Sequence, residues 1–430
     1  MFEAFRADPC RVLETLADPT ALYRIWRNLR NRGAAALLDE VSVAADTLPS
    51  SGQPVNSTDS NPCPSAGALV FIDATLPKSD RDAGGRSSYL YIKLLREMGY
   101  EVFFMPNDQL RREPYARSLE ELGVKLLIGS SFRCGNWKQW LKKHRQNISA
   151  VIVNRPNVAK RYVSAIKKIA GIRVVYFACD LRSLREQRHF ELSGDRFHRW
   201  EAKYWEKVER RLIAQADKAY FFSDEEVRAV ASWVGGARAQ SLPLFPVRIE
   251  PISAVPFDQR KGLLFVGGFA HQPNVDGIIW FANEVLPLIQ KAINGVTLQV
   301  VGAHPPKDLQ GREKIELLGY VTESQLVERY ERSLVVIAPL RFGAGVKGKV
   351  VEALIHRVPL VTTTIGAEGL SVSPQTVDIC DDPVTFAKAV IRLHQEREHW
   401  IERRKNMELY AAESLASQRA IDVLQESLKT

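Results

Sequence analysis

The stretch LVVIAPLRFGAGVKGKVVEALIH, residues 334–356, contains the clearest structural pattern of the sequence. It begins with a nearly continuous apolar run, passes through a loop with three glycines, and continues with apolar residues at helical spacing. An apolar strand that leads through a short loop into a helix is the repeating unit of a parallel sheet covered by helices on both faces.

The same unit recurs along most of the chain, in two series separated by the proline-rich segment SLPLFPVRIEPISAVPF. The strand-like runs of the first series are ALVFID, EVFFMP, KLLIGS, AVIVNRP, RVVYFACD and KAYFFSD. Those of the second series are GLLFVGGF, VTLQVVGA, IELLGYV, LVVIAPL, VPLVTTT and TVDICD. The sequence therefore predicts an α/β protein with two doubly wound, Rossmann-like domains.

The predicted domains have the following bounds. Residues 1–47 have apolar residues at helical spacing and form an N-terminal helical extension, and residues 48–66 are rich in Pro, Ser, Asn and Gly and form a flexible linker. The two Rossmann-like domains span residues 67–250 and 251–410. Residues 411–430 form a C-terminal helix that could cross back to the first domain.

The composition excludes several classes of protein. The chain has 430 residues, is 45% hydrophobic and 25% charged, and contains no apolar run long enough to span a membrane. The start MFEAFRADPC lacks the basic residues and apolar core of a signal peptide. Five scattered cysteines without a CxxC pair argue against a disulfide framework or a cysteine zinc site, and for a reducing compartment. The net charge of +9 favours anionic partners.

The glycine-rich loop after residue 340 is the first candidate for binding chemistry. Ligands of parallel sheets bind beyond the carboxyl ends of the strands, and the N–H groups at a helix start attract phosphate. Gly345 and Gly348 permit close backbone approach, and Lys347 and Lys349 add positive charge. Glu352, one turn into the helix, could accept hydrogen bonds from a ribose diol. The stretch fits a nucleotide diphosphate; the alternative is an ordinary glycine turn with solvated lysines.

Further candidates follow other strands. In the second domain, VGGFAHQPN supplies Gly267, Gly268, His271 and Asn274, which could bind a donor molecule or only cap the next helix. In the first domain, DAGGRSSYL supplies Gly84, Gly85 and Arg86 ahead of a helix that opens with Ser87. Asp180 ends another strand, within a charged run that could instead be a solvated helix face, and Cys179 beside it is interpreted as a small buried residue.

The segment WKQWLKKHRQ, residues 137–146, combines two tryptophans with basic residues. Such a segment suits an anionic membrane surface or nucleic acid. Trp137 and Leu141 are also one helical turn apart, so packing of the aromatic residues is the simpler interpretation.

These motifs resemble the family 4 (group 1) retaining glycosyltransferases of the bacterial polysaccharide-assembly type, which have the GT-B fold. The resemblance rests on LLFVGGFAHQPNVDGIIWFANEVLPLI, LQVVGA, IELLGYV and VVIAPLRFGAGVKGKVVEALIHRVPLVTTTIGAEGL, and on weaker matches in DAGGR and at Arg155-Pro156. It covers roughly residues 67–420.

The resemblance implies transfer of a sugar from a nucleotide-diphosphate-sugar donor to a saccharide or lipid-linked acceptor. The implied catalytic residues are Lys347, Lys349 and Asp180. The implied donor-binding residues are Gly267, Gly268, His271, Asn274, Gly345, Val346, Gly348, Glu352, Gly366 and Glu368. The implied acceptor-binding residues are Gly84, Gly85, Arg86 and Arg155. No metal and no cofactor other than the co-substrate is expected, and the enzyme would work in the cytoplasm, at the inner face of an anionic membrane.

One departure from the family pattern keeps alternatives open. Many relatives have two glutamates seven residues apart; Glu352 matches the second, but Ala344 stands at the first. A non-catalytic protein that binds nucleotide sugars is the main alternative, and a sugar-nucleotide epimerase of similar fold is another. Nucleic-acid binding is poorly supported, because the basic residues are dispersed. The donor base, the sugar and the acceptor have no local sequence code.

Overall fold

The computed structural model describes residues 67–133, 135–169, 171–233, 238–249, 255–269, 271–343 and 345–428. The predicted N-terminal helical extension and linker, residues 1–66, lie outside the described residues, as does Ala344.

Within the described residues, the first domain contains a seven-stranded parallel sheet with the strand order β3-β2-β1-β4-β5-β6-β7. The strands are β1 (Ala68–Asp73), β2 (Glu101–Pro106), β3 (Lys125–Leu126), β4 (Ile148–Asn154), β5 (Arg173–Phe177), β6 (Lys218–Phe221) and β7 (Ala239–Ser241). The helices are α4 (Ala83–Glu97), α5 (Tyr115–Glu121), α6 (Trp137–His144), α7 (Pro156–Ile166), α8 (Arg182–Ser193), α9 (Arg196–Gln215) and α10 (Asp224–Ala231), with a 3-10 turn at Ser130–Phe132. The strand order reverses between β1 and β4, which is where doubly wound sheets open a crevice for ligands.

The described part of the second domain contains a six-stranded parallel sheet with the order β10-β9-β8-β11-β12-β13. The strands are β8 (Lys261–Val266), β9 (Leu298–Val301), β10 (Ile315–Gly319), β11 (Ser333–Ala338), β12 (Leu360–Thr362) and β13 (Asp378–Ile379). The helices are α11 (Gln272–Trp280), α12 (Leu286–Ala292), α13 (Glu323–Arg332), α14 (Gly348–His356), α15 (Thr364–Ala367), α16 (Pro383–Gln395) and α17 (Arg397–Tyr410). Short 3-10 turns lie at Phe257–Gln259 and Lys307–Leu309, and π-helical turns at Phe281–Val285 and Ala411–Leu415.

The central strands of each sheet are buried on both faces, which explains why they read as continuous apolar runs. All six residues of β1 are buried. Leu69 and Phe71 join the core cluster that includes residues of α4, whereas Val70 and Ile72 join the cluster that includes residues of α7. This alternation follows from the two-residue period of a strand and fixes the register of the sheet centre.

The edge strands differ from the sequence prediction. Of the predicted runs KLLIGS and TVDICD, only two residues each pair with a neighbour, as β3 and β13 at the edges of the two sheets. Strand β7 was not predicted, because Ala239–Ser241 is too short to show a period.

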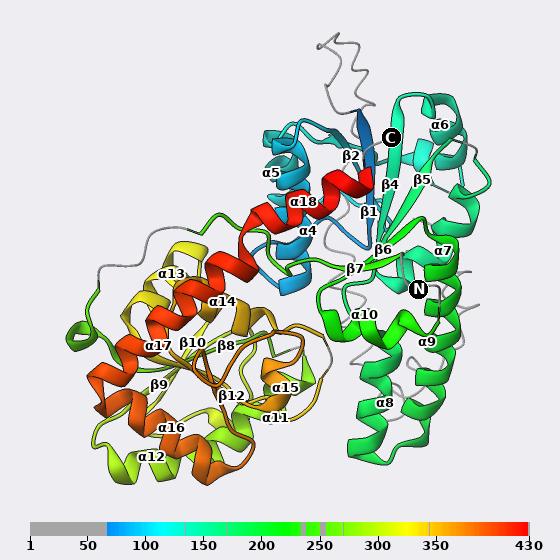
Figure 1. Cartoon of the computed structure of the whole chain (residues 1–430). Coiled ribbons are helices and arrows are strands. Elements are labelled where there is room, and N and C mark those ends of the chain that lie inside the picture. The colour runs from blue at the N-terminus through cyan, green and yellow to red at the C-terminus, as the bar shows by residue number, and fades with distance from the viewer. Residues whose placement is uncertain are drawn as a thin grey trace.

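The C-terminal segment crosses from the second domain to the first (Figure 1). After α17, helix α18 (Ser417–Leu428) lies against the first domain. The Ser417 amide donates to the Val247 carbonyl at 3.0 Å, and the Arg173 guanidinium of β5 donates to the Ser427 carbonyl at 2.5 Å. Two segments of the chain therefore connect the domains, which limits how they can move apart.

Candidate functional site

A cavity of about 550 Å³ lies between the domains, lined by residues that follow the carboxyl ends of strands in both sheets. The predicted site residues that line it are Gly84, Arg86, Arg155, Asp180, Gly267, Gly268, His271, Asn274, Gly345, Val346, Lys347, Gly348, Lys349 and Glu352. Gly85, Gly366 and Glu368 were also predicted and are not among its lining residues.

The loop between β11 and α14 brings the two domains close together. Gly345 has a positive φ of 70°, which a residue with a side chain adopts only with strain. A Cβ atom at Gly348 would lie 2.6 Å from the Cβ of Ala83 in the first domain. Glycine is thus required at these positions by the backbone turn and by the approach of the opposite domain, besides any contact with a ligand.

The two lysines of this loop face the cavity from the start of α14. Lys347 occupies the N-cap position without capping the helix through its side chain. Its ammonium group donates to Glu368 at 3.2 Å and to the Gly345 carbonyl. The Lys349 ammonium donates to Asn274 and lies 5.3 Å from the centre of the Phe265 ring.

Burial changes the protonation of both lysines. It lowers the pKa of Lys347, although Glu368 opposes this shift. It lowers the pKa of Lys349 to about 7, and the positive charge of Lys347 adds to the effect. An anion placed between these side chains would favour their charged forms, so the loop can gain positive charge when it binds a phosphate.

Glu352, which was predicted to bind a ribose, interacts with other protein side chains in this structure. Its carboxylate accepts a hydrogen bond from the Tyr330 hydroxyl at 3.1 Å and lies 3.4 Å from the guanidinium of Arg86. Burial raises its pKa, while Arg86 opposes the shift. Because Arg86 belongs to the first domain and also lies 3.4 Å from Glu323, it links the domains across the cavity.

Asn274 does not cap the helix that follows it, although capping was one of the two interpretations of the sequence. Helix α11 begins at Gln272, so Asn274 lies inside its first turn and is not the N-cap residue. Its amide donates to the Gly268 carbonyl at 2.7 Å and accepts from Lys349. His271 is at the N-cap position without a side-chain cap, and burial lowers its pKa to about 4. A neutral imidazole therefore faces the cavity near neutral pH.

On the first domain, α4 begins at Ala83 and not at Ser87, because Asp82 caps it by accepting from the Gly85 amide at 2.8 Å. Gly84 is covered by the Arg155 guanidinium, which a Cβ atom would meet at 2.8 Å. Gly85 instead packs against the backbone of Lys78, where a Cβ atom would lie 2.6 Å from the carbonyl oxygen. The glycine pair thus serves close packing, and of the two only Gly84 lines the cavity.

A buried carboxylate that was not predicted as a site residue holds Arg155. Asp73, at the end of β1, is 2% exposed and accepts from Arg155 Nε at 2.8 Å. It also accepts from Ser88 at 2.7 Å and from Asn154 at 2.8 Å. The sequence signal that could have identified Asp73 is its position at the end of a predicted strand, before the DAGGR loop. The network fixes the Arg155 side chain at the first-domain wall of the cavity.

Asp180 lies at the cavity wall and is paired with Arg185, whose guanidinium donates to it at 2.5 Å. The pair suits the orientation of a substrate hydroxyl, since one carboxylate oxygen already has a cationic partner. Burial raises the pKa of Cys179 to about 12, and its thiol donates to Asn154 at 2.9 Å. This agrees with the interpretation of Cys179 as an unreactive residue.

Glu368 and Gly366 have roles in packing between and within domains. Glu368 pairs with Lys347 and with Arg188 of α8, which also donates to the Gly343 carbonyl at 3.1 Å. A Cβ atom at Gly366 would overlap the Thr362 hydroxyl. Glu368 is therefore paired with a lysine that lines the cavity, without being a lining residue itself.

The WKQWLKKH segment forms α6, and its aromatic residues pack inward. Trp137 is 4% exposed and lies 5.0 Å from the Tyr162 ring, and Trp140 contacts Phe103 and Phe132. The basic side chains at 138, 142, 143 and 145 remain exposed. Among the described residues, no helix is both long enough and apolar enough to cross a membrane.

Comparison with known proteins agrees with the predicted family. Residues 260–396 match the family model of glycosyl transferases group 1. Over 186 residues the chain is 27% identical to an uncharacterised 44.6 kDa protein in the cps region of Klebsiella pneumoniae. That match covers 41% of this chain and 46% of the relative, so the chain spans about half the length of this curated protein.

Several solved structures have the same two-domain architecture. Sucrose-phosphate synthase from Thermosynechococcus elongatus is 14% identical with a TM-score of 0.60, over 84% of this chain and 98% of that chain. A complex of S. aureus TarM with fondaparinux, alpha-GlcNAc-glycerol and UDP is 10% identical with a TM-score of 0.64, over 85% and 100%. Anabaena HepE with UDP and glucose is 13% identical with a TM-score of 0.59, over 84% and 100%.

These likenesses confirm the GT-B fold that the sequence predicted. The resemblance to group 1 glycosyltransferases is confirmed over residues 260–396, which include the loop and helix that carry Lys347 and Lys349.

Proposed function

We propose that the protein is a cytoplasmic glycosyltransferase that moves a sugar, with retention of configuration, from a nucleotide-diphosphate-sugar donor to a saccharide or lipid-linked acceptor. The reaction would serve the synthesis of a surface polysaccharide or glycoconjugate. The observation that carries this proposal is the cavity between the sheets, where the start of α14 with Lys347 and Lys349 is opposite Arg155 and Asp180. The group 1 match, the UDP found in HepE and TarM, and the relative from a cps region support it.

The donor would bind with its diphosphate at the start of α14. The leaving nucleotide diphosphate gains negative charge in the transition state, and the free N–H groups of the helix start with Lys347 and Lys349 would stabilise that charge. These groups can act without a metal ion. Asp180 would orient the acceptor hydroxyl, and same-face attack would retain the configuration.

A non-catalytic protein that binds nucleotide sugars is the second candidate, and Ala344 favours it. Both candidates require donor binding, so turnover separates them. An assay of donor hydrolysis and of transfer to a panel of saccharide acceptors detects product if the protein is an enzyme. Donor binding without any product on the panel would favour the non-catalytic protein.

We predict that one nucleoside diphosphate stabilises the protein selectively. A thermal-shift panel of the diphosphates UDP, GDP, ADP and dTDP, with the monophosphate CMP beside them, measures this, because a ligand present at 100 times its Kd adds about 2.7 kcal/mol to the free energy of unfolding. Lys349→Met should weaken the shift, since it removes a cation from the diphosphate site. The absence of any shift in the wild-type protein would contradict a nucleotide-sugar donor.

We also propose that the protein meets a lipid-linked acceptor at an anionic membrane, through the exposed basic side chains of α6 and Arg145. We predict flotation with vesicles containing anionic lipid, weakened by salt and by Lys142→Glu with Lys143→Glu. Neutral vesicles and a Lys388→Glu variant, changed on the exposed side of α16, are the controls. Equal binding to anionic and neutral vesicles would contradict the proposal.

A further inference from the structure

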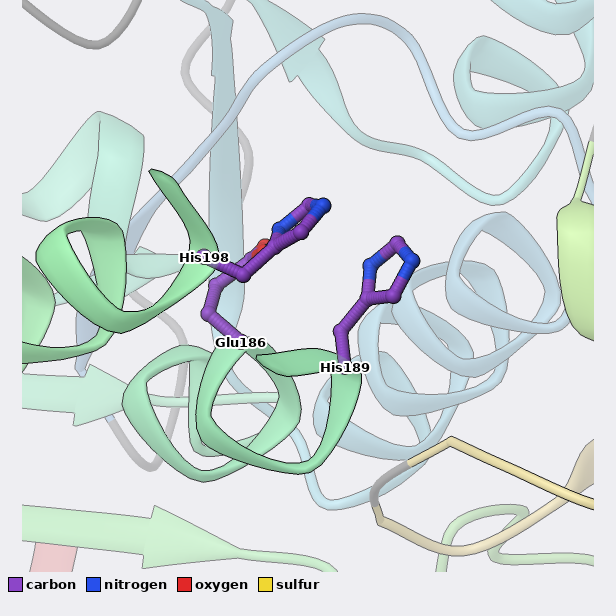
Figure 2. Close-up of side chains that lie close together, drawn as sticks. All are labelled: Glu186, His189 and His198. Carbon is purple, nitrogen blue, oxygen red and sulfur yellow. The ribbon is translucent and has the colours of Figure 1, made fainter. Parts of the chain in front are cut away.

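Three side chains of the types that bind transition metals come together where α8 meets α9, and none of them is among the lining residues of the cavity (Figure 2). They are Glu186, His189 and His198, and their ligand atoms all lie within 4.8 Å of one another. Glu186 is 8% exposed and His198 is 6% exposed, so the cluster is largely withdrawn from solvent.

Local structure explains why these residues meet. Glu186 and His189 are three residues apart on α8 and therefore lie on one helix face. Gly194 ends α8 with a left-handed backbone conformation, and Asp195 caps α9 by accepting from the Phe197 amide at 2.9 Å. This tight turn places His198, in the first turn of α9, beside the face of α8 that carries the other two.

We propose that Glu186, His189 and His198 bind one divalent transition-metal ion, for which zinc is the best fit. Two imidazoles and a carboxylate, with water in the fourth position, are an established zinc ligand set. Glu186 Oε2 and His198 Nδ1 are 2.9 Å apart. Metal–ligand bonds of about 2.0–2.2 Å place neighbouring ligand atoms roughly 3–3.5 Å apart, so an ion can replace the shared proton after a small shift, with release of that proton.

The His189 ring has to turn to complete the site. It is stacked on the His198 ring, with 3.7 Å between the centroids and 26° between the planes, so the two rings do not yet point at one ion. His189 is only partly buried. Binding therefore requires the His189 ring to turn away from its stack on His198.

The surrounding charges set the strength of the site. Arg182 and Arg185 lie 3.9 Å and 3.8 Å from the other oxygen of Glu186, Oε1. They help to orient the carboxylate, so that Oε2 faces His198. Their positive charge, however, opposes the binding of a cation. We therefore expect weaker binding than at structural zinc sites with cysteine ligands.

The ion would bind to the pair of helices α8 and α9, and α8 also contacts the second domain. Arg188 lies between the two ligands on α8 and contacts the Gly343 carbonyl and Glu368 of the second domain. The His189 ring also stacks near Phe342, with 5.6 Å between the centroids. An ion that ties α8 to α9 would thus stiffen the segment that touches the glycine-rich loop, without taking part in sugar transfer.

The test uses the full chain, stripped of metal with a chelator and titrated with Zn²⁺ alone by calorimetry. We predict saturable binding of one ion per chain, and a rise of the melting temperature with zinc. Glu186→Gln and His189→Ala should each weaken zinc binding at least tenfold. His304→Asn is the matched control, because His304 is exposed and lies outside the cluster, and asparagine tolerates its positive φ of 57°.

Two outcomes would overturn the proposal: wild-type protein without saturable zinc binding, or zinc binding by both cluster variants as tight as that of the His304→Asn control. The melting temperature without zinc shows whether each variant is folded, and if one is not, the other decides. Because no nucleotide or acceptor is present, the result is independent of the proposed glycosyltransferase activity.

Discussion

Lys349→Met is expected to lower kcat by roughly 10²–10³, equivalent to about 2.7–4 kcal/mol of transition-state stabilisation, which is the effect of removing one donor from a developing anion. Methionine keeps an apolar side chain of similar length but cannot donate to Asn274 or to a phosphate, and it loses the ammonium group that lies 5.3 Å from the centre of the Phe265 ring. The measurement is kcat for transfer, or for donor hydrolysis, beside Lys388→Met on the exposed side of α16 as control. Equal kcat in the two variants would remove Lys349 from the mechanism.

The same variant should be more stable than the wild-type protein, in a pH-dependent way. The folded-state pKa of Lys349 is about 7, below its ordinary value of 10.5, so folding favours the neutral amine. The cost of burying the charge is fully present below pH 7 and fades as the pH rises to 10.5. The melting temperature of Lys349→Met should therefore exceed that of the wild type more at pH 6.5 than at pH 9.5. A constant difference would contradict the lowered pKa.

The sequence was sufficient to predict those features that repeat locally. The apolar runs located both sheets, and the rule that ligands bind at the carboxyl ends of strands located the cavity. Lys347, Lys349 and Asp180 were found in this way, because each directly follows a predicted strand or opens a helix. The strand order within each sheet has no such local signal, since it depends on which strands pair across distant parts of the chain.

The partners of the site residues could not be predicted, for the same reason. Arg155 is held by Asp73, which is 82 residues away, and Arg86 reaches Glu352 in the other domain. Gly348 lines the cavity as predicted, but its close approach to Ala83 of the first domain was not predicted. Local spacing does not encode such contacts.

The charged run of α8 was the most misleading pattern. A run of arginines and glutamates is typical of a solvated helix face. In the structure the first residues of α8 are held by a buried carboxylate of α9: Glu209 accepts from the Arg182 amide at 2.8 Å and from the Ser183 hydroxyl at 2.5 Å. Burial raises the pKa of Glu209 to about 8. The packing of α8 on α9 determines which charges are solvated. Because this packing cannot be read from the sequence, the cluster of Glu186, His189 and His198 was not predicted.

Asp73→Ala is expected to destabilise the first domain by about 1–3 kcal/mol, the cost of removing a buried acceptor from its hydrogen-bond donors. The change removes an acceptor from Arg155, from the Ser88 hydroxyl and from the Asn154 amide, whereas the Arg155 side chain is 32% exposed and can regain water. At roughly 2–4 °C per kcal/mol for a domain of this size, the melting temperature should fall by about 2–12 °C. Asp73→Asn keeps the volume and one acceptor oxygen, so its effect should be intermediate.

The control is Asp258→Ala, which removes an exposed carboxylate 3.2 Å from Arg397 and should cost about 1 kcal/mol or less. Equal melting temperatures for the two alanine variants would show that Asp73 does not support the fold.

Below its melting temperature, Asp73→Ala should affect the first-domain side of the cavity and leave the second-domain side unchanged. Arg155 would lose the partner that holds it over Gly84, whereas Lys347 and Lys349 belong to the other domain. Under the proposed function Arg155 belongs to the acceptor site and not to the donor site, so stabilisation by the nucleoside diphosphate should persist while transfer to the acceptor falls.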